Sequence, residues 1–224
     1  MSLTGEQQHE RRGTQRPGGR TERTRRAVAQ AVLDQFAEGD SGLNVSEIAA
    51  RAGVHRSTLH RRWPTRAALL EEALTLHTSR IEIPDTGGIA DDIVALARGL
   101  AGFFGDPVEV ALNAALVTHA DRQVDAAQVA HWISLLPDLA RPLRKAIERG
   151  ELRADMDPLV LLNLLIGPLV MYTTLVHTTP EPWLVDQLAL ALVRAGKATP
   201  RVEERVLELI GRRPEGVDPS PWSR

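Results

Sequence analysis

The stretch Val45–Trp63 places small and apolar residues at the spacing that a helix-turn-helix requires. Counted from its first residue, Ala49 is fifth, Gly53 ninth and Leu59 fifteenth. The two helices of such a unit cross closely, so the fifth position must be small, and the turn needs a residue that tolerates a positive φ. Leu59 on the second helix is expected to pack against Ile48. Because these constraints are met together, the sequence predicts a helix-turn-helix here.

Helical periodicity also extends through the rest of the chain, and no run of residues alternates in the manner of a β-strand. Four short helices are predicted over residues 21–80, with Thr21 capping the first and Asn44 capping the second. Pro84 and the two glycines that follow it mark a boundary, after which the chain continues as helices. The predicted fold class is therefore all-α.

Composition and turn residues divide the chain into four parts. The first part is rich in Gly, Gln, Arg and Pro and has almost no apolar residue, so it cannot bury a core. The parts are a disordered basic arm at residues 1–20, a helix-turn-helix domain at residues 21–80, a helical domain at residues 81–196, and a tail at residues 197–224 with at most a short helix over 202–210.

The net charge of −2 combines a basic front with an acidic rear. Residues 1–80 carry 13 Arg against 9 Asp and Glu, a balance of +4. Residues 81–224 carry 14 Lys and Arg against 20 Asp and Glu, a balance of −6. This asymmetry favours a polyanionic partner for the front of the chain alone.

Several classes of protein are excluded by what the chain lacks. It has no cysteine, so neither a disulfide framework nor a zinc-thiolate site is possible, which suits a reducing cytoplasm. The N-terminus lacks the apolar core of a secretory signal, and the longest apolar run, residues 159–171, is too short to cross a bilayer. No recognisable catalytic motif is present, so an enzyme, a bound cofactor and a membrane partner are not expected.

The second helix of a helix-turn-helix enters the major groove of double-stranded DNA, so its outward side chains are candidate DNA contacts. Arg reads guanine with two hydrogen bonds, and Ser or Thr reaches a base or a phosphate. On the first helix, Asn44 and Ser46 lie at an N-terminus whose free N–H groups would bind a phosphate. Arg66 lies in the first turn of the next helix, where a cation opposes the helix dipole unless a phosphate is near. The outward residues of the second helix are Arg56, Ser57, Thr58, His60 and Arg61.

The segment "NVSEIAARAGVHRSTLHRRWPTRAALLEEAL" resembles the DNA-binding region of TetR-family transcriptional regulators, and the resemblance is specific across about residues 21–75. It implies a DNA-binding transcriptional regulator with a helical effector-binding and dimerisation domain behind the helix-turn-helix. Four positions differ from the common family residues. Asn44 replaces Thr as the helix cap, and His60 replaces a Tyr that contacts phosphate. Trp63 replaces Phe, and Arg66 replaces Lys. Since histidine also donates to phosphate, the resemblance still implies a phosphate contact at His60.

Two segments of the rear domain, "LVLLNLLIGPLV" and "WLVDQLALALV", have almost no polar face. A helix that is apolar on all sides must be buried on all sides, and a second copy of the chain can supply the missing cover. Pro168 is expected to kink the first of these helices. Because the resemblance implies a dimer through the last helices, a C2 homodimer built on residues 157–195 is predicted, with an ordinary intramolecular core as the alternative.

The resemblance also implies a small-molecule effector, whose identity the sequence does not give. Candidates for its pocket are polar and aromatic groups on apolar helix faces, and the alternative for each is a satisfied core or surface position. The histidines are well separated and lack a close partner pattern, so no metal site is predicted. The candidates are Asn113, His119, His131, Trp132, Asn163, Met171, Tyr172 and His177.

Together these features predict a ligand-responsive transcriptional regulator: a repressor that binds palindromic operator DNA as a homodimer and is released by its effector. By linkage, the effector would weaken DNA binding by the same factor by which DNA weakens effector binding. The alternative is a helical ligand-binding or interaction module that has lost DNA binding, in which the exposed arginines are solvated surface charge. Salt-dependent binding to duplex DNA distinguishes the two hypotheses.

Overall fold

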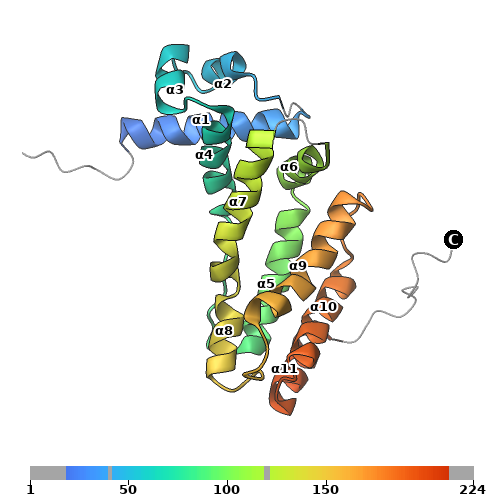
Figure 1. The fold of residues 1–224 in the computed structure, drawn as a ribbon. Helices are drawn as coiled ribbons and strands as arrows, with labels where there is room; N and C mark the ends of the chain where they lie inside the picture. The colour runs from blue at the N-terminus through green and yellow to red at the C-terminus, as the bar shows by residue number, and fades with distance from the viewer. Residues whose placement is uncertain (1–18, 40–41, 119–121, 212–224) are drawn as a thin grey trace, which may run out of the picture.

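The computed structural model of the protein describes residues 19–39, 42–118 and 122–211, and these residues form helices without a strand (Figure 1). The predicted all-α fold, with a helix-turn-helix domain in front of a helical domain, is confirmed. The predicted disordered arm lies outside the described residues apart from its last two positions. The helices are α1 (Arg20–Ala37), α2 (Val45–Arg51), α3 (Arg56–Arg62), α4 (Arg66–Thr78), α5 (Ile89–Phe104), α6 (Pro107–Thr118), α7 (Arg122–Leu139), α8 (Arg141–Glu148), α9 (Pro158–Thr174), α10 (Pro182–Ala195) and α11 (Pro200–Ile210).

Helices α1–α4 form the head of the molecule, in which α2 and α3 lie on one side of α1 and α4 runs from the head toward the other domain (Figure 1). α1 buries Val28, Val32 and Phe36, whose four-residue spacing forms one apolar face. The expected cap at Thr21 is wrong, because α1 begins one residue before Thr21 and has Gly19 as its N-cap. Gly19 lies in extended backbone before the first turn, and no side chain caps this helix.

In the second domain, α5 lies in the centre and packs against α8, α9, α10 and α11. It buries Ile93, Leu96 and Leu100 among these helices. α9 contributes Leu161 and Leu165 to the same apolar cluster. Burial of these aliphatic side chains is the main favourable term that holds the domain together.

Prolines mark the boundary between α7 and α8. Pro137 lies in the last turn of α7, which ends at Leu139, and Pro142 lies in the first turn of α8. A proline is tolerated in the first turn of a helix but interrupts the hydrogen bonds of a helix interior. Pro168 lies inside α9, which continues to Thr174, so this proline does not end the helix.

α11 lies in the segment predicted to be a tail with at most a short helix. Its buried residues Val202 and Val206 are four apart and pack with α5 and α10. The helical domain therefore extends through residue 210, and the amphipathic helix begins at Pro200, before the predicted start. No helix among the described residues is long and apolar enough to cross a membrane.

The head and the second domain meet where α4 packs on α7 and α1 packs on α6 (Figure 1). Leu112 of α6 and Val124 of α7 belong to the same apolar cluster as the core of the head. The two domains are therefore joined by packed side chains. Because close-packed side chains transmit displacements, a movement of α6 or α7 would shift the helices of the head.

Candidate nucleic-acid interface and the junction behind it

The geometry between α2 and α3 is that of the predicted helix-turn-helix. Gly53 has φ +64°, in the left-handed region that glycine adopts without strain. The Val54 amide donates to the Ala49 carbonyl at 3.0 Å and closes the turn. Ile48 and Leu59 are both fully buried in the core of the head. The small fifth position, the glycine turn and the apolar seal are therefore present as predicted.

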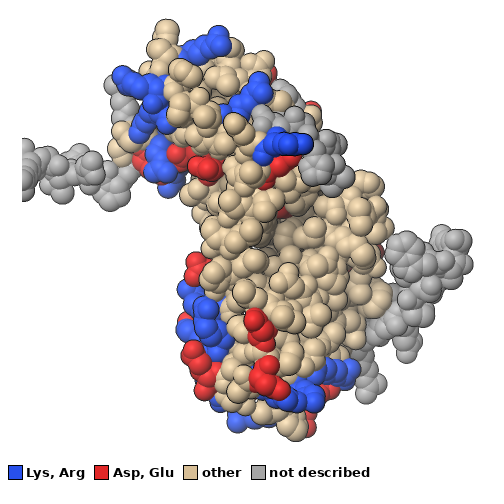
Figure 2. Space-filling model, in the orientation of Figure 1, with Lys and Arg blue, Asp and Glu red and all other residues tan. Residues whose placement is uncertain are grey.

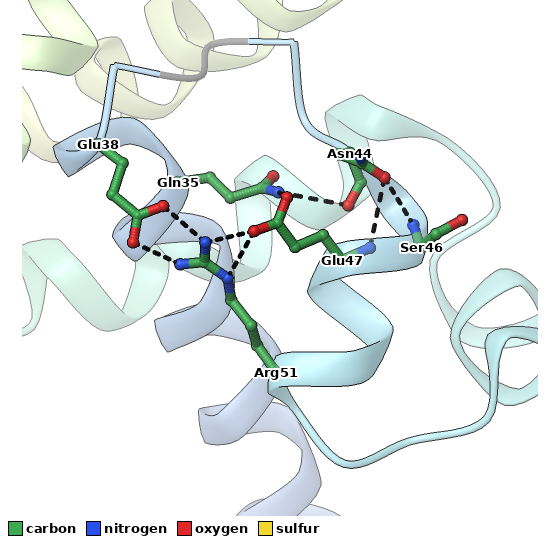
Figure 3. Close-up of polar contacts among 6 residues, drawn as sticks. All are labelled: Gln35, Glu38, Asn44, Ser46, Glu47 and Arg51. Carbon is green, nitrogen blue, oxygen red and sulfur yellow. Dashed lines mark hydrogen bonds and ion pairs between the residues drawn. The ribbon is translucent and has the colours of Figure 1, made fainter.

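The N-terminus of α2 differs from the expectation of free N–H groups for a phosphate. Asn44 caps the helix, and its Oδ1 accepts hydrogen bonds from the amides of Ser46 at 3.1 Å and Glu47 at 3.3 Å (Figure 3). The cap occupies these two backbone amides. The groups that remain for a phosphate include the exposed Ser46 hydroxyl and the side-chain nitrogen Nδ2 of Asn44.

A polar cluster joins α2 to the end of α1 (Figure 3). Arg51 on α2 donates to both carboxylate oxygens of Glu38, at 2.7 and 2.6 Å, and also pairs with Glu47. Gln35 on α1 donates to Glu47 at 3.3 Å and to the Asn44 carbonyl at 3.4 Å. The hydrogen bonds from Arg51 lower the pKa of Glu38 below its usual value. This cluster fixes the first helix of the motif on the head.

The outward face of α3 carries the predicted DNA contacts. Arg56, Ser57, His60 and Arg61 are exposed, whereas Thr58 is half-buried. Figure 2 shows Arg side chains distributed over the head. A depression beside α3 brings together Arg56, Ser57, His60 and, from α4, Arg66. Its full lining is Val45, His55, Arg56, Ser57, His60, Trp63, Pro64, Thr65, Arg66 and Leu69.

The C-terminal end of α3 is held by a contact that the sequence did not predict. The indole N–H of Trp63 donates to Glu72 Oε2 on α4 at 3.1 Å, and Trp63 is 6% exposed. The Arg62 guanidinium lies 5.5 Å from the centre of the Trp63 ring. The only sequence signal for this contact is the Trp at a position where Phe is commoner, because Phe has no N–H to donate.

Behind the head, the last turn of α4 enters a buried polar network with α6. His77 Nε2 lies 3.1 Å from Glu109 Oε2, and both side chains are 1% exposed. Asn113 donates to the other oxygen of Glu109 at 2.9 Å. Arg80 NH2 lies 2.7 Å from His77 Nδ1 and 3.1 Å from Asp106. Since a guanidinium can only donate, His77 Nδ1 must be the acceptor, and its Nε2–H then donates to Glu109.

α7 joins the same junction through His131 and Trp132. The Thr78 hydroxyl donates to the Leu74 carbonyl at 2.8 Å, so its oxygen accepts from His131 Nε2 at 2.9 Å. Burial lowers the pKa of His131, which favours the neutral ring, in the tautomer that carries its proton on Nε2. Trp132 stacks on Phe104, with ring centres 5.4 Å apart, and meets the edge of Phe103 at 5.9 Å.

The residues predicted to line an effector pocket are placed in different regions. Asn113, His131 and Trp132 come together at the junction of α4, α6 and α7. Met171 and Tyr172 lie near the end of α9, respectively exposed and half-buried. The other three are His177, exposed with φ +54° after α9; Asn163, exposed and donating to the Leu159 carbonyl at 2.8 Å; and His119, outside the described residues.

His77, Arg80 and Glu109 were not predicted from the sequence, although they form the centre of the junction. Each is a single polar residue whose partner is distant in the sequence, so no periodic pattern marks it, and only the tertiary fold brings the end of α4 next to α6. Within the described ranges, no group of three or more His, Asp or Glu side chains is placed to hold a metal ion.

Two family models match the chain. The model described as the tetracyclin repressor-like C-terminal domain matches residues 83–192, which run from just before α5 into α10. The IclR helix-turn-helix domain model matches residues 27–62, which cover most of α1 together with α2 and α3. The first model thus covers most of the second domain, and the other covers the helix-turn-helix.

Curated relatives match along most of their length. The HTH-type transcriptional regulator AqdR of Rhodococcus erythropolis is 30% identical over 81% of this chain and 89% of that protein. The DNA-binding transcriptional repressor TetR of Mycobacteroides abscessus is 28% identical over 76% of this chain and 92% of that protein. A TetR transcriptional regulator from Agrobacterium tumefaciens has a similar crystal structure, with a TM-score of 0.67 at 22% identity over 81% of this chain and 98% of that one.

Proposed function

Because the chain belongs to the TetR family of transcriptional regulators, we propose that it is a repressor that binds palindromic operator DNA as a homodimer and is released by a small-molecule effector. Membership confirms the prediction of a DNA-binding transcriptional regulator rather than an enzyme. The proposal includes action in the cytoplasm, where the operator would be found.

The observation that carries the proposal is the exposed polar face of α3. Arg56, Ser57 and His60 project from one side of a helix whose opposite side is sealed by Leu59. Arg66 reaches the same depression from the start of α4. In DNA-binding helix-turn-helix proteins the second helix of the motif lies in the major groove, and cations beside it contact phosphates. The same arrangement here would place α3 in the major groove and Arg66 near a phosphate.

Selection of bound sequences from a random pool of duplexes tests the proposal directly. A recovered palindrome would support both DNA reading and a twofold-symmetric dimer. Affinity for the selected duplex should fall steeply as salt is added, because phosphate contacts release counterions. A folded dimer that shows no salt-dependent duplex binding would instead favour a module that has lost DNA binding.

Base reading and phosphate binding are expected to respond differently to substitution. Arg56→Ala and Arg61→Ala should each weaken binding to the selected duplex by about ten- to a hundredfold and relax the preference at one base position. Arg66→Ala should weaken selected and random duplexes about equally and make the salt dependence shallower. Competition titrations at several salt concentrations measure both quantities.

The matched control for these variants is Arg201→Ala, which removes the same charge from an exposed position on α11. It should leave affinity, base preference and salt dependence unchanged. If Arg56→Ala and Arg61→Ala weakened all duplexes equally, α3 would act through phosphates alone, and base reading by these residues would be excluded.

An apolar face of the second domain supports the proposed dimer. Figure 2 shows a broad region of this domain without charged side chains. Val160, Leu164 and Met171 recur on α9 at helical spacing and are 39–55% exposed. Further exposed apolar residues are Leu159 in the first turn of α9, Leu175 just after its end, and Val129 and Ile133 on α7. An exposed apolar face of this kind is typical of a protein–protein interface. In a twofold-symmetric dimer the same face of a second copy would cover it.

The junction of α4, α6 and α7 supports the proposed response to an effector. Trp132, His131 and Asn113 offer aromatic and polar groups beside α4, which leads directly to the head. A ligand that displaced these residues would disturb the hydrogen bonds that hold the last turn of α4. The spacing of the two heads in the dimer would then change, and DNA and effector would weaken each other's binding reciprocally.

A further inference from the structure

We infer that Glu72 is a positioning residue for the recognition helix α3, acting through the indole N–H of Trp63 and anchored in turn by Arg25. The inference rests on the proposed DNA-binding role of α3, because it concerns the orientation in which α3 is presented. Glu72 does not line the depression beside α3, so its influence on DNA would be indirect.

Three separate elements meet at the Glu72 carboxylate. The Trp63 indole, from the residue that ends α3, donates to Oε2 at 3.1 Å. Arg25, from α1, donates through Nε to Oε1 at 2.9 Å and to Oε2 at 3.1 Å, and its NH2 lies 2.8 Å from Oε1. One carboxylate on α4 therefore ties the end of α3 to both long helices of the head.

The Trp63–Glu72 hydrogen bond is partly buried, whereas the Arg25 side chain that pairs with the same carboxylate is 45% exposed. Glu72 exposes 16% of its side chain and Trp63 is 6% exposed, so water competes weakly for either group. The hydrogen bonds that Arg25 donates to Glu72 raise the pKa of the Arg25 guanidinium. Loss of the carboxylate would leave the buried indole N–H without its acceptor, and such a group costs free energy until the ring moves.

The short length of α3 explains why such an anchor affects DNA reading. α3 spans Arg56–Arg62, which is too short for a helix to be stable or oriented by itself. Its N-cap, His55, makes no side-chain capping bond. The orientation of α3 is therefore set by the Leu59 seal in its middle and by Trp63 at its end. A small rotation about Leu59 would move Arg61 away from a base edge, and base contacts depend on such geometry.

The inference is tested by Trp63→Phe, Glu72→Gln and the double variant, measured with the selected duplex. Trp63→Phe keeps an aromatic ring in the core but removes the N–H donor and one ring of the indole. Glu72→Gln removes the ion pair with Arg25 and weakens the acceptor, without changing the volume of either aromatic position. Each single variant should lower affinity for the selected duplex by about three- to tenfold. The double variant should lose less than the product of the two single effects, because both disrupt the same contact.

A second readout separates positioning from contact with DNA. Because neither variant removes a phosphate contact, the salt dependence should stay that of the wild type while preference for the selected over a random duplex falls. Urea unfolding of every variant at the temperature of the titrations shows that each is folded there, so that the titrations report binding alone. The matched control is Glu71→Gln, the same change at the exposed neighbouring position on α4, which should bind as the wild type does.

Two results would overturn the inference. One is wild-type affinity and preference in folded Glu72→Gln, and the other is a shallower salt dependence in Trp63→Phe, which would mean that a phosphate contact had been lost. Failure of the wild type to bind any duplex would be a different outcome, since it would contradict the proposed function itself rather than the role of Glu72.

Discussion

Leu164→Glu is expected to convert the proposed dimer into a monomer and to lower affinity for the palindromic duplex by about a hundredfold or more. Leu164 is 46% exposed on the apolar face of α9. In a twofold interface the substitution appears twice, and each unpaired carboxylate would lose its hydration on assembly. A monomer would then bind a single half-site, without the gain in effective concentration that links the two heads. Sedimentation velocity at micromolar concentration, together with a DNA titration, measures both effects.

Leu207→Glu supplies the matched control for the dimer prediction. Leu207 is 43% exposed, close to the value for Leu164, but it lies on α11 outside the proposed interface. This variant should remain a dimer and bind the palindrome as the wild type does. A wild-type protein that sediments as a monomer, or a Leu164→Glu protein that stays dimeric, would show that the apolar face of α9 is not the interface.

Glu109→Ala is expected to lower the free energy of unfolding by about 3 kcal/mol. Glu109 accepts from His77 and from Asn113, and the His77 and Glu109 side chains are almost fully buried. Removal of the carboxylate would leave two buried donors without an acceptor and a cavity beside them. Urea unfolding monitored by circular dichroism measures the change, with the slope of the transition compared between variants.

Glu148→Ala is the control for the junction, because it removes a carboxylate from an exposed position on α8. Its free energy of unfolding should stay within about 0.5 kcal/mol of the wild type. A loss below about 1 kcal/mol for Glu109→Ala would contradict a stabilising role for the network. In that case α4 would depend on apolar packing alone for its contact with α6.

The helix-turn-helix was predictable because its determinants are local. The small Ala49, the glycine turn at Gly53 and the seal by Leu59 follow from the geometry of two short helices joined by one turn. The same locality explains the confirmed cap at Asn44, whose side chain bonds amides two and three residues away. The same cap makes one expectation wrong: it occupies the backbone amides of Ser46 and Glu47, which were expected to be free for a phosphate.

The groups that hold α3 and α4 in place could not be predicted in this way. Glu72 meets Trp63 and Arg25, and His77 meets Glu109, across sequence separations of 9, 47 and 32 residues. Each of these residues is an ordinary polar position on its own helix, with no periodic signal to mark it. The pairing depends on how the helices are rotated and crossed, which is decided by packing of the whole core.

By itself, the sequence determined that the chain is helical, that it carries a helix-turn-helix, and which side of α3 faces outward. These properties follow from periodicity and turn chemistry within about twenty residues. Only the tertiary structure decided that α11 belongs to the core, that Asn113, His131 and Trp132 share one junction, and which carboxylates anchor the motif. The reason is physical: a helix fixes the direction of its own side chains, but the neighbours that they meet depend on contacts between segments far apart in the chain.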